Sequence, residues 1–426
     1  MIQSFNKINK VSGILSFLGD KSISHRALLI SSLANGKSVI RNLSDSDDVN
    51  STINCLKELE IKIELNNNEA IVFGRGFRGY QKPMNPLNAG NSGTTARLLS
   101  GILAAQNFES IIIGDESLSS RPMRRIIEPL TKMEASIKSE NDYKLPLKIF
   151  PSEKITAINY ALPVASAQVK SSILLLGIHL DETTTVVETR QTRNHTENLL
   201  DLKVKLLNGK IISSVSKVNY PEPQEYFIPG DISSAMFFIV LTLVTKNSEL
   251  VIKDICLNPT RIECLNLLKR MGGNIQIEEI GVSNNEVFGD IIVKSSELSN
   301  VLIDNEIIPL IIDEIPVMIV SGLFAEGKFE IRGASELRSK ESDRIKAICN
   351  NLLKLGLDVE EFDDGFNVSG TIKQGSKQFE SFGDHRIAMA FAVLSSLLDN
   401  GGEVKGFECV SISNPYFLKQ LQSISS

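Results

Sequence analysis

Several Lys and Arg residues stand at the start of segments that have the pattern of apolar helices. In GDKSISHRALL (19–29), Lys21 and Ser22 fall at the expected helix start, and Arg26 faces the same way, four residues after Ser22. The amino end of a helix carries partial positive charge, so cations there are unfavourable unless an anion is bound. Such ends also offer free backbone N–H groups to anions. The segment predicts an anion site; a plain N-cap serine beside solvated charges is the alternative.

Two further segments have the same polar-to-apolar plan. AGNSGTTARLL (89–99) places Gly93 and Thr94 before an apolar stretch, and glycine lets a ligand approach the backbone closely. Downstream, Arg121 precedes a proline, which favours extended backbone for Arg121 and holds it off the next helix. Ser/Gly/Thr runs also cap ordinary helices, so this evidence is weak by itself.

The segment SAQVK (166–170) begins another apolar stretch. Its Ser166 and Gln168 suit a polyhydroxy ligand, because an amide both donates and accepts hydrogen bonds. The later string RNHTE (193–197) adds Arg193 and His195. A histidine alone is more often structural, so His195 stays open.

Carboxylates enter in the second half of the chain. Asp313 opens a further apolar segment, either as an ordinary N-cap or as a base facing cations. Lys340, Glu341 and Arg344 are spaced to share one helical face, although a salt-bridged surface helix has the same spacing.

The string GDHRIAMAF (383–391) begins with a charged triplet. It places His385 and Arg386 directly before an apolar helix, where surface charge is an unsatisfactory explanation.

Together these side chains describe a site for anions and proton transfer. Arginines favour planar carboxylates and tetrahedral phosphates, and the acids with Lys21 can move protons. Because no Ser–His pairing or reactive cysteine motif accompanies them, direct transfer between two substrates is favoured over a covalent enzyme intermediate.

The elements that must position these residues repeat six times along the chain. Each copy has a small or polar opening, about ten mostly apolar residues and a turn; the copies span 19–36, 89–106, 165–182, 230–247, 313–328 and 383–401. A helix that is apolar all round is buried. β-like runs follow five of them, at 38–43, 110–114, 183–188, 248–255 and 328–333. We expect an α/β fold with helices inside and sheets outside, three units in each of two domains.

Composition sets limits on function. The 426 residues carry a formal net charge of −6, which disfavours nucleic acid as a partner. No apolar run reaches membrane-spanning length, and we expect a cytoplasmic protein. Five scattered cysteines and four histidines show no disulfide or metal spacing, so no metal and no cofactor are expected.

Nine strings, in order over about residues 19–394, resemble the 5-enolpyruvylshikimate-3-phosphate synthase family, a branch of the enolpyruvyl transferases. The wording of SAQVKS and RNHTE is similar to its class II bacterial branch. The strings are GDKSISHRALL, AGNSGTTARLL, SRPM, PVASAQVKS, RNHTE, GDISSA, DEIP, ELRSKESDRI and GDHRIAMA.

The resemblance implies two inside-out α/β barrel domains, each of three βαβαββ units. They would span 20–229 and 1–19 with 230–426, with crossovers near 19–21 and 229–231 and the active site in the cleft between them. It implies transfer of the enolpyruvyl group of phosphoenolpyruvate to the 5-hydroxyl of shikimate 3-phosphate, through a tetrahedral intermediate with loss of phosphate. The implied enzyme belongs to the shikimate pathway and is a monomer without a cofactor.

The resemblance also implies roles for residues. Asp313 would accept the hydroxyl proton, while Glu341 and Lys21 are candidates to protonate the methylene carbon. The implied contacts of shikimate 3-phosphate are Lys21, Ser22, Arg26, Ser166, Ala167 (backbone only), Gln168, Arg193, Asp313 and Lys340. The implied contacts of phosphoenolpyruvate are Lys21, Gly93, Thr94, Arg121, Gln168, Arg344, His385 and Arg386.

This sequence departs from the family pattern at two places. Ile412 and Ser413 occupy a stretch where many members carry a lysine, and Glu336 stands where some have a substrate-binding amide. Gly93 is retained where variants insensitive to glyphosate often have alanine, so we expect glyphosate sensitivity.

Two alternatives remain. The sister transferase that acts on UDP-N-acetylglucosamine has a loop cysteine five residues before its Arg-Pro pair, where this chain has Glu116. A non-catalytic anion-binding relative would be expected to have lost Asp313 or Glu341, and both are present.

Overall fold

The computed structural model describes residues 1–372 and 377–425. The chain forms two compact units. Unit 1 comprises Met1–Phe17, Gly230–Gly281 and Val287–Ser426, and unit 2 comprises Leu18–Pro229 and Val282–Glu286. Nothing in the sequence indicated that the short turn at 282–286 would group with unit 2 rather than with the residues on either side of it.

Three helices form the interior of unit 2, and they coincide with the first three apolar segments. They are α1 (Lys21–Leu33), α3 (Gly93–Ala104) and α6 (Ala167–Gly177). In α1 every residue from Ile23 onward is buried. Burial on all sides confirms the expectation drawn from their composition.

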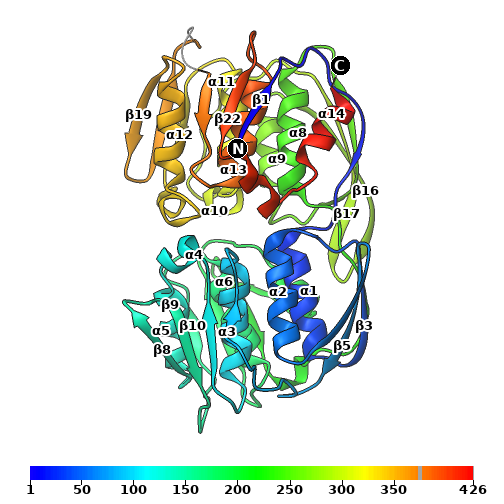
Figure 1. Cartoon of the computed structure of the whole chain (residues 1–426), viewed down its shortest axis with the longest axis vertical. Helices are drawn as coiled ribbons and strands as arrows, with labels where there is room; N and C mark the ends of the chain where they lie inside the picture. The colour runs from blue at the N-terminus through cyan, green and yellow to red at the C-terminus, as the bar shows by residue number, and fades with distance from the viewer. Residues whose placement is uncertain (373–376, 426) are drawn as a thin grey trace. The chain divides into compact units, whose positions relative to one another are not determined.

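Unit 1 has the same plan, which Figure 1 shows with its helices labelled. Its interior helices are α8 (Ile232–Val244), α11 (Ile315–Leu323) and α13 (His385–Ser395). All residues of α13 are buried, and only Val244 of α8 is not fully buried. These three helices pack against one another in one hydrophobic core.

Open sheets flank these helices. In unit 2, in hydrogen-bonded order, they are β14 (Glu225–Phe227), β3 (Asn35–Arg41), β5 (Glu69–Arg75) and β4 (Lys62–Asn66); β6 (Leu87–Asn88), β7 (Ser110–Ile113), β9 (Lys144–Phe150) and β8 (Ser136–Asn141); and β10 (Asn159–Ala161), β11 (Thr184–Glu188), β13 (Lys210–Val215) and β12 (Lys205–Leu207).

Unit 1 also has three sheets in the part of the chain that the structure describes. They are β16 (Asn274–Ser283), β17 (Glu286–Lys294), β15 (Glu249–Cys256) and β2 (Ser12–Ser16); β1 (Ile2–Phe5), β22 (Gly402–Lys405) and β21 (Gln378–Glu380); and β18 (Phe329–Ile331), β20 (Gly365–Ser369) and β19 (Asp358–Phe362).

The sheets share one pairing rule. In each four-stranded sheet a strand pairs in parallel with its neighbour, which in turn pairs with an antiparallel hairpin. The five β-like runs of the sequence all fall on strands, which confirms those predictions. The fold is mixed α/β with interior helices and outer sheets, and no sheet closes into a barrel among the described residues.

The remaining α-helices are only partly buried. They are α2 (Asp47–Glu58), α4 (Glu116–Ser120), α5 (Arg124–Lys132), α7 (His195–Leu199), α9 (Glu263–Arg270), α10 (Ile308–Ile311), α12 (Arg344–Leu353) and α14 (Phe417–Ile424).

Polar side chains mark the start of five of the six interior helices. The residues Asp20, Ser92, Ser166, Asp231 and Asp384 each accept a hydrogen bond from a backbone N–H of the first turn. α11 differs, because Glu314 occupies its N-cap without such a bond and Asp313 precedes it. The interpretation of Asp313 as a possible N-cap was therefore wrong.

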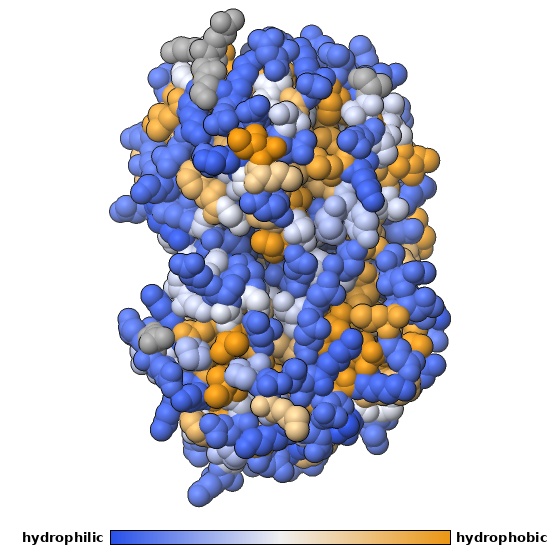
Figure 2. Space-filling view, in the orientation of Figure 1, coloured by the Kyte–Doolittle hydropathy of each residue, from blue (hydrophilic) through white to orange (hydrophobic). Residues whose placement is uncertain are grey.

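The surface is polar in the view that Figure 2 shows, with hydrophobic residues in small patches. The described residues form no helix that is long and apolar enough to cross a membrane.

A buried histidine of unit 2 makes stability depend on pH. His179 contacts the rings of Phe77 and Tyr220, and burial lowers its pKa to about 4. The pKa in the unfolded chain is about 6.5, so its contribution to stability is complete above that pH and is lost as pH falls. The loss amounts to about 1.4 kcal/mol per pH unit between the two pKa values.

We therefore expect His179→Phe to flatten the acid limb of the stability curve. Phenylalanine fits the aromatic cluster and binds no proton, although the contact between Nδ1 and the Leu175 carbonyl oxygen is lost. The measurement is the free energy of unfolding by urea at several pH values from 7 to 4. His25, whose pKa burial also lowers, retains part of the slope in both proteins. Parallel curves for variant and parent would contradict the assignment to His179.

Candidate functional site

Arg26 lies buried in unit 2 and is fixed by three hydrogen bonds. Its Nε donates to Thr196 Oγ1 at 2.7 Å, its Nη2 to Ser171 Oγ at 2.9 Å and its Nη1 to the carbonyl oxygen of Ser22 at 2.9 Å. Burial lowers the pKa of Arg26 to about 10, so the side chain remains a cation at neutral pH. A guanidinium held in this way is preorganised to bind an anion.

Lys21 is the first residue of α1 and pairs with an acid from α2. Its Nζ lies 2.7 Å from Asp48 Oδ2, and both side chains are mostly buried. Asp20 caps the same helix through its bond from the N–H of Ile23. The amino end of α1 therefore carries the cation that the sequence placed there, together with a carboxylate that partly balances it.

A chain of polar contacts joins the starts of α3 and α6. Arg97 Nη1 donates to Gln168 Oε1 at 2.7 Å, and Gln168 Nε2 donates to Thr94 Oγ1 at 3.0 Å. Gly93 lies directly beside this chain, because a Cβ built on it would be 2.6 Å from Arg97 Nη1. Ser166 caps α6, and Ala167 is the first residue of that helix.

Arg121 follows α4 in extended backbone, as its position before a proline predicted. Its Nη2 donates to Asn91 Oδ1 at 2.6 Å and to Ser117 Oγ at 3.0 Å. Arg121 Nη1 is also 3.6 Å from a Cβ placed on Gly93, so the two expected contacts of phosphoenolpyruvate are neighbours.

Arg193 and His195 belong to the segment that leads from β11 into α7. Arg193 lies close enough to Arg26 for its charge to lower the pKa of Arg26. His195 is fully buried, and its Nδ1 lies 2.8 Å from Glu286 Oε1. His195 is therefore a structural residue of unit 2, the more common of the two roles considered for it.

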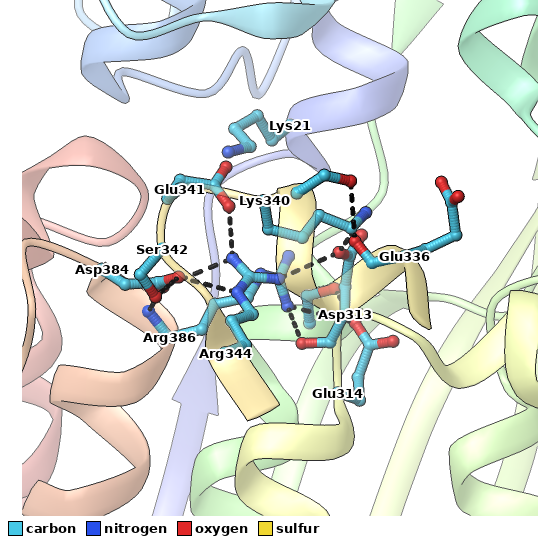
Figure 3. A network of polar contacts seen from close by, with 12 residues as sticks. Lys21, Asp313, Glu314, Glu336, Lys340, Glu341, Ser342, Arg344, Asp384 and Arg386 are labelled. Atoms are coloured by element: carbon cyan, nitrogen blue, oxygen red, sulfur yellow. Dashed lines mark hydrogen bonds and ion pairs between the residues drawn. The ribbon is translucent and has the colours of Figure 1, made fainter. Parts of the chain in front are cut away.

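Arg344 lies at the centre of a group of charged side chains in unit 1, which Figure 3 shows. Its side chain is only 1% exposed and meets three carboxylates. Nε lies 2.7 Å from Asp384 Oδ2, Nη2 lies 2.6 Å from Glu341 Oε2, and Nη1 lies 3.3 Å from Asp313 Oδ1. These contacts raise the pKa of Arg344 above its ordinary value despite burial.

Asp313 is also held by two other cations. Lys340 Nζ donates to Asp313 Oδ1 at 3.2 Å, and Arg386 Nη1 donates to the Asp313 carbonyl oxygen at 2.8 Å. Arg386 Nη1 also lies 3.3 Å from Glu314 Oε1 (Figure 3). His385 is the first residue of α13, after the cap Asp384, and is buried.

The expectation that Lys340, Glu341 and Arg344 share a helical face was wrong. A 3₁₀ helix ends at Ser339, Lys340 has extended backbone, and α12 begins only at Arg344. Glu341 nevertheless contacts Arg344, and Lys340 and Arg344 both contact Asp313 Oδ1, because the chain is not helical between the two helices. Asp343 caps α12.

The predicted site residues thus form two clusters, one in each unit. The cluster of unit 2 contains Lys21, Ser22, Arg26, Gly93, Thr94, Arg121, Ser166, Ala167, Gln168 and Arg193. The cluster of unit 1 contains Asp313, Lys340, Glu341, Arg344, His385 and Arg386. The first is rich in cations and hydroxyls and suits phosphate groups. The second combines cations with carboxylates and can both bind an anion and move protons.

The chain matches the family model described as EPSP synthase (3-phosphoshikimate 1-carboxyvinyltransferase) over residues 5–421. This chain belongs to the EPSP synthase family. It is 46% identical over 421 residues to the 3-phosphoshikimate 1-carboxyvinyltransferase of Petrotoga mobilis, with 98% of each chain covered. It is 43% identical over 414 residues to that of a Thermoanaerobacter species, with 96% of each covered.

Solved structures agree with this family. An EPSP synthase of Acinetobacter baumannii superposes with a TM-score of 0.86 at 34% identity, covering 100% of this chain and 98% of the other. The enolpyruvyl transferase NikO of Streptomyces tendae superposes with a TM-score of 0.74 at 13% identity, covering 99% and 97%, and shows the common fold alone.

In this member of the EPSP synthase family, sequence reasoning assigned no role to several charged residues that support one cluster or the other from within the same unit. They are Asp48, Arg97, Arg261 and Glu314. Arg97 had a detectable signal, since it is a lone charge inside an apolar helix. Asp48 had none, because an acid in the first turn of a surface helix is ordinary.

Gly93→Ala is expected to disturb the polar chain at the starts of α3 and α6. The new methyl carbon would lie 2.6 Å from Arg97 Nη1, so the guanidinium must move and its bond to Gln168 weakens. We expect a shifted Arg97 in a crystal structure of the variant.

The matched comparison is Gly93→Ala in an Arg97→Ala background. If the glycine acts through Arg97, Gly93→Ala costs little further stability or ligand affinity when Arg97 is already alanine. Equal losses in both backgrounds would mean that Gly93 acts by another route.

Proposed function

We propose that this chain transfers the enolpyruvyl group of phosphoenolpyruvate to the 5-hydroxyl of shikimate 3-phosphate, with release of phosphate. The family match supports the reaction, and one feature of the site carries it: the Asp313 carboxylate is held between Lys340 and Arg344. A base among cations suits a reaction in which an alcohol is deprotonated beside an anionic co-substrate.

Unit 2 supplies the contacts proposed for shikimate 3-phosphate. Arg26, Lys21 and Ser22 contact this substrate, while Ser166, the Ala167 backbone, Gln168 and Arg193 hold its ring and 3-phosphate. Asp313 and Lys340, from unit 1, act at the 5-hydroxyl. The preorganised guanidinium of Arg26, with its three hydrogen bonds, supports this division.

Phosphoenolpyruvate takes its proposed contacts from both units. Gly93, Thr94, Gln168, Arg121 and Lys21 belong to unit 2, and Arg344, His385 and Arg386 belong to unit 1. We propose that the reaction needs both units, because neither one contains a complete set of ligands.

The proposed chemistry is addition followed by elimination. Asp313 accepts the hydroxyl proton as the oxygen attacks phosphoenolpyruvate, and Glu341 or Lys21 protonates the methylene carbon. The tetrahedral intermediate then loses phosphate, and the surrounding cations stabilise the charge that develops on the leaving group. A cytoplasmic monomer without a cofactor remains our expectation.

The test is phosphate release from phosphoenolpyruvate with one acceptor at a time. We expect release with shikimate 3-phosphate and none with UDP-N-acetylglucosamine. The reverse result would assign the chain to the sister transferase. No release with either acceptor, together with retained binding of shikimate 3-phosphate, would indicate a non-catalytic relative.

We predict that Asp313→Asn lowers kcat by about 100-fold or more, because general base catalysis contributes factors of this size. Asparagine keeps the size of the side chain, so affinity for shikimate 3-phosphate should change much less. A timed phosphate-release assay measures kcat, and calorimetric titration measures the affinity for shikimate 3-phosphate.

Asp364→Asn is the control for this substitution. Asp364 is a carboxylate of unit 1 that pairs with Arg332 outside the cluster. The kcat of Asp364→Asn should stay within about twofold of the parent value, as expected for surface substitutions away from special features. Unchanged kcat in Asp313→Asn would remove Asp313 from the role of base.

A further inference from the structure

Lys170 is buried in unit 2 between two glutamates. Its Nζ lies 2.7 Å from Glu188 Oε2 and 2.7 Å from Glu197 Oε1, and all three side chains are at most 2% exposed. Lys170 lies on α6, Glu188 is the last residue of β11, and Glu197 lies on α7. One lysine therefore holds both ends of the segment 188–197.

The segment has little regular structure to position it. Between β11 and α7 its residues 189–194 are neither helix nor strand, and α7 has only five residues. A helix of that length has no stability of its own. Glu188 also accepts a hydrogen bond from Thr192 Oγ1, and Ser213 Oγ donates to Glu197 at 3.1 Å. The place of the segment thus depends on its side-chain contacts.

The residues adjacent to Lys170 and Glu197 in the chain bind Arg26. Ser171 follows Lys170 on α6, Thr196 precedes Glu197 on α7, and the two hydroxyls lie 2.7 Å apart. Both accept a hydrogen bond from Arg26. The Lys170–Glu197 ion pair is thus adjacent to the pair of hydroxyls that fixes the guanidinium. Arg193 lies inside the same segment.

Stability alone does not explain this arrangement. Three charges removed from water carry a large desolvation cost, and apolar replacements of such groups are often neutral or stabilising. Moreover, the buried Glu197 Oε2 makes no hydrogen bond within the described residues. Geometry is what the cluster provides: it sets the distance between α6, the end of β11 and α7.

We propose that Lys170 is a positioning residue: its ion pairs with Glu188 and Glu197 fix both ends of the segment 188–197. Lys170 thereby holds Arg26 and Arg193 in place for a phosphorylated ligand. The identity of that ligand as shikimate 3-phosphate rests on the proposed function. Lys170 itself touches no substrate in this account.

The two ion pairs of Lys170, with Glu188 and Glu197, are called the clamp below. The main variant removes the clamp without leaving a buried charge unpaired. It is Lys170→Met combined with Glu188→Gln and Glu197→Gln. We expect the Kd for shikimate 3-phosphate, measured by calorimetry, to rise at least tenfold, while the KM for phosphoenolpyruvate changes less than threefold. A general loss of structure would move both constants together.

Limited digestion with trypsin gives a readout that needs no substrate. Arg190 and Arg193 lie inside the segment, and Arg190 is exposed. We expect new early cleavage at these two residues in the triple variant and not in the parent. If the parent fails to bind shikimate 3-phosphate but the cleavage appears as expected, the proposed function fails and the clamp stands.

The matched control removes an ion pair from unit 1. Lys253→Met with Asp290→Asn deletes the contact between Lys253 and Asp290, which lies outside both clusters. This control should keep the Kd of the parent and gain no cleavage in 188–197. Parent-like binding and digestion of the triple variant would overturn the proposal.

Glu197→Gln decides the question if the triple variant does not fold. Loss of a negative charge near Arg26 would by itself strengthen phosphate binding, because the charge of Glu197 acts on Arg26. A weakened clamp has the opposite effect, so we expect the Kd to rise at least threefold. An unchanged or lower Kd would overturn the positioning role.

Discussion

The fold depends on helices that are buried on every side. Such a helix can satisfy its backbone within itself except at its two ends, where N–H and carbonyl groups need partners. Polar chemistry is therefore concentrated at the helix starts, and the capping residues Asp20, Ser92, Ser166, Asp231 and Asp384 all stand there. The same positions are next to the cations Lys21 and Arg386. One constraint, burial of the helix body, thus accounts for both the caps and the place of the site.

Several buried cations have a carboxylate partner, whereas Arg26 is held by two hydroxyls and a carbonyl oxygen. Arg344 has Asp384, Glu341 and Asp313, Lys21 has Asp48, and Lys170 has two glutamates. Without such partners a charge at this depth would cost several kcal/mol. The contacts also fix the direction of each side chain. Preorganised cations of this kind lose little freedom when an anion binds, which is the usual source of affinity in a site built from long side chains.

The sequence was most informative where local pattern decides structure. The six apolar segments and five β-like runs became interior helices and strands, because burial on all sides and strand alternation are properties of short stretches. It was misleading at Lys340–Arg344, where helical spacing was present but the chain is not helical before α12. The ion pair of Asp48 with Lys21 and those of Lys170 with its two glutamates also could not be predicted from the sequence. They join separate elements, and such pairings depend on tertiary packing that no local spacing encodes.

The carboxylates that hold the cations also bear on the order of chemical events. Lys340 and Arg344 both contact Asp313 Oδ1, while Arg386 contacts the carbonyl oxygen of the same residue. We propose that phosphoenolpyruvate binds Arg344 and Arg386, so it must share these two cations with Asp313. Its arrival would draw Arg344 away from the carboxylate and so make Asp313 a stronger base when the anion is present. Coupling of this kind joins binding to base catalysis through one arginine.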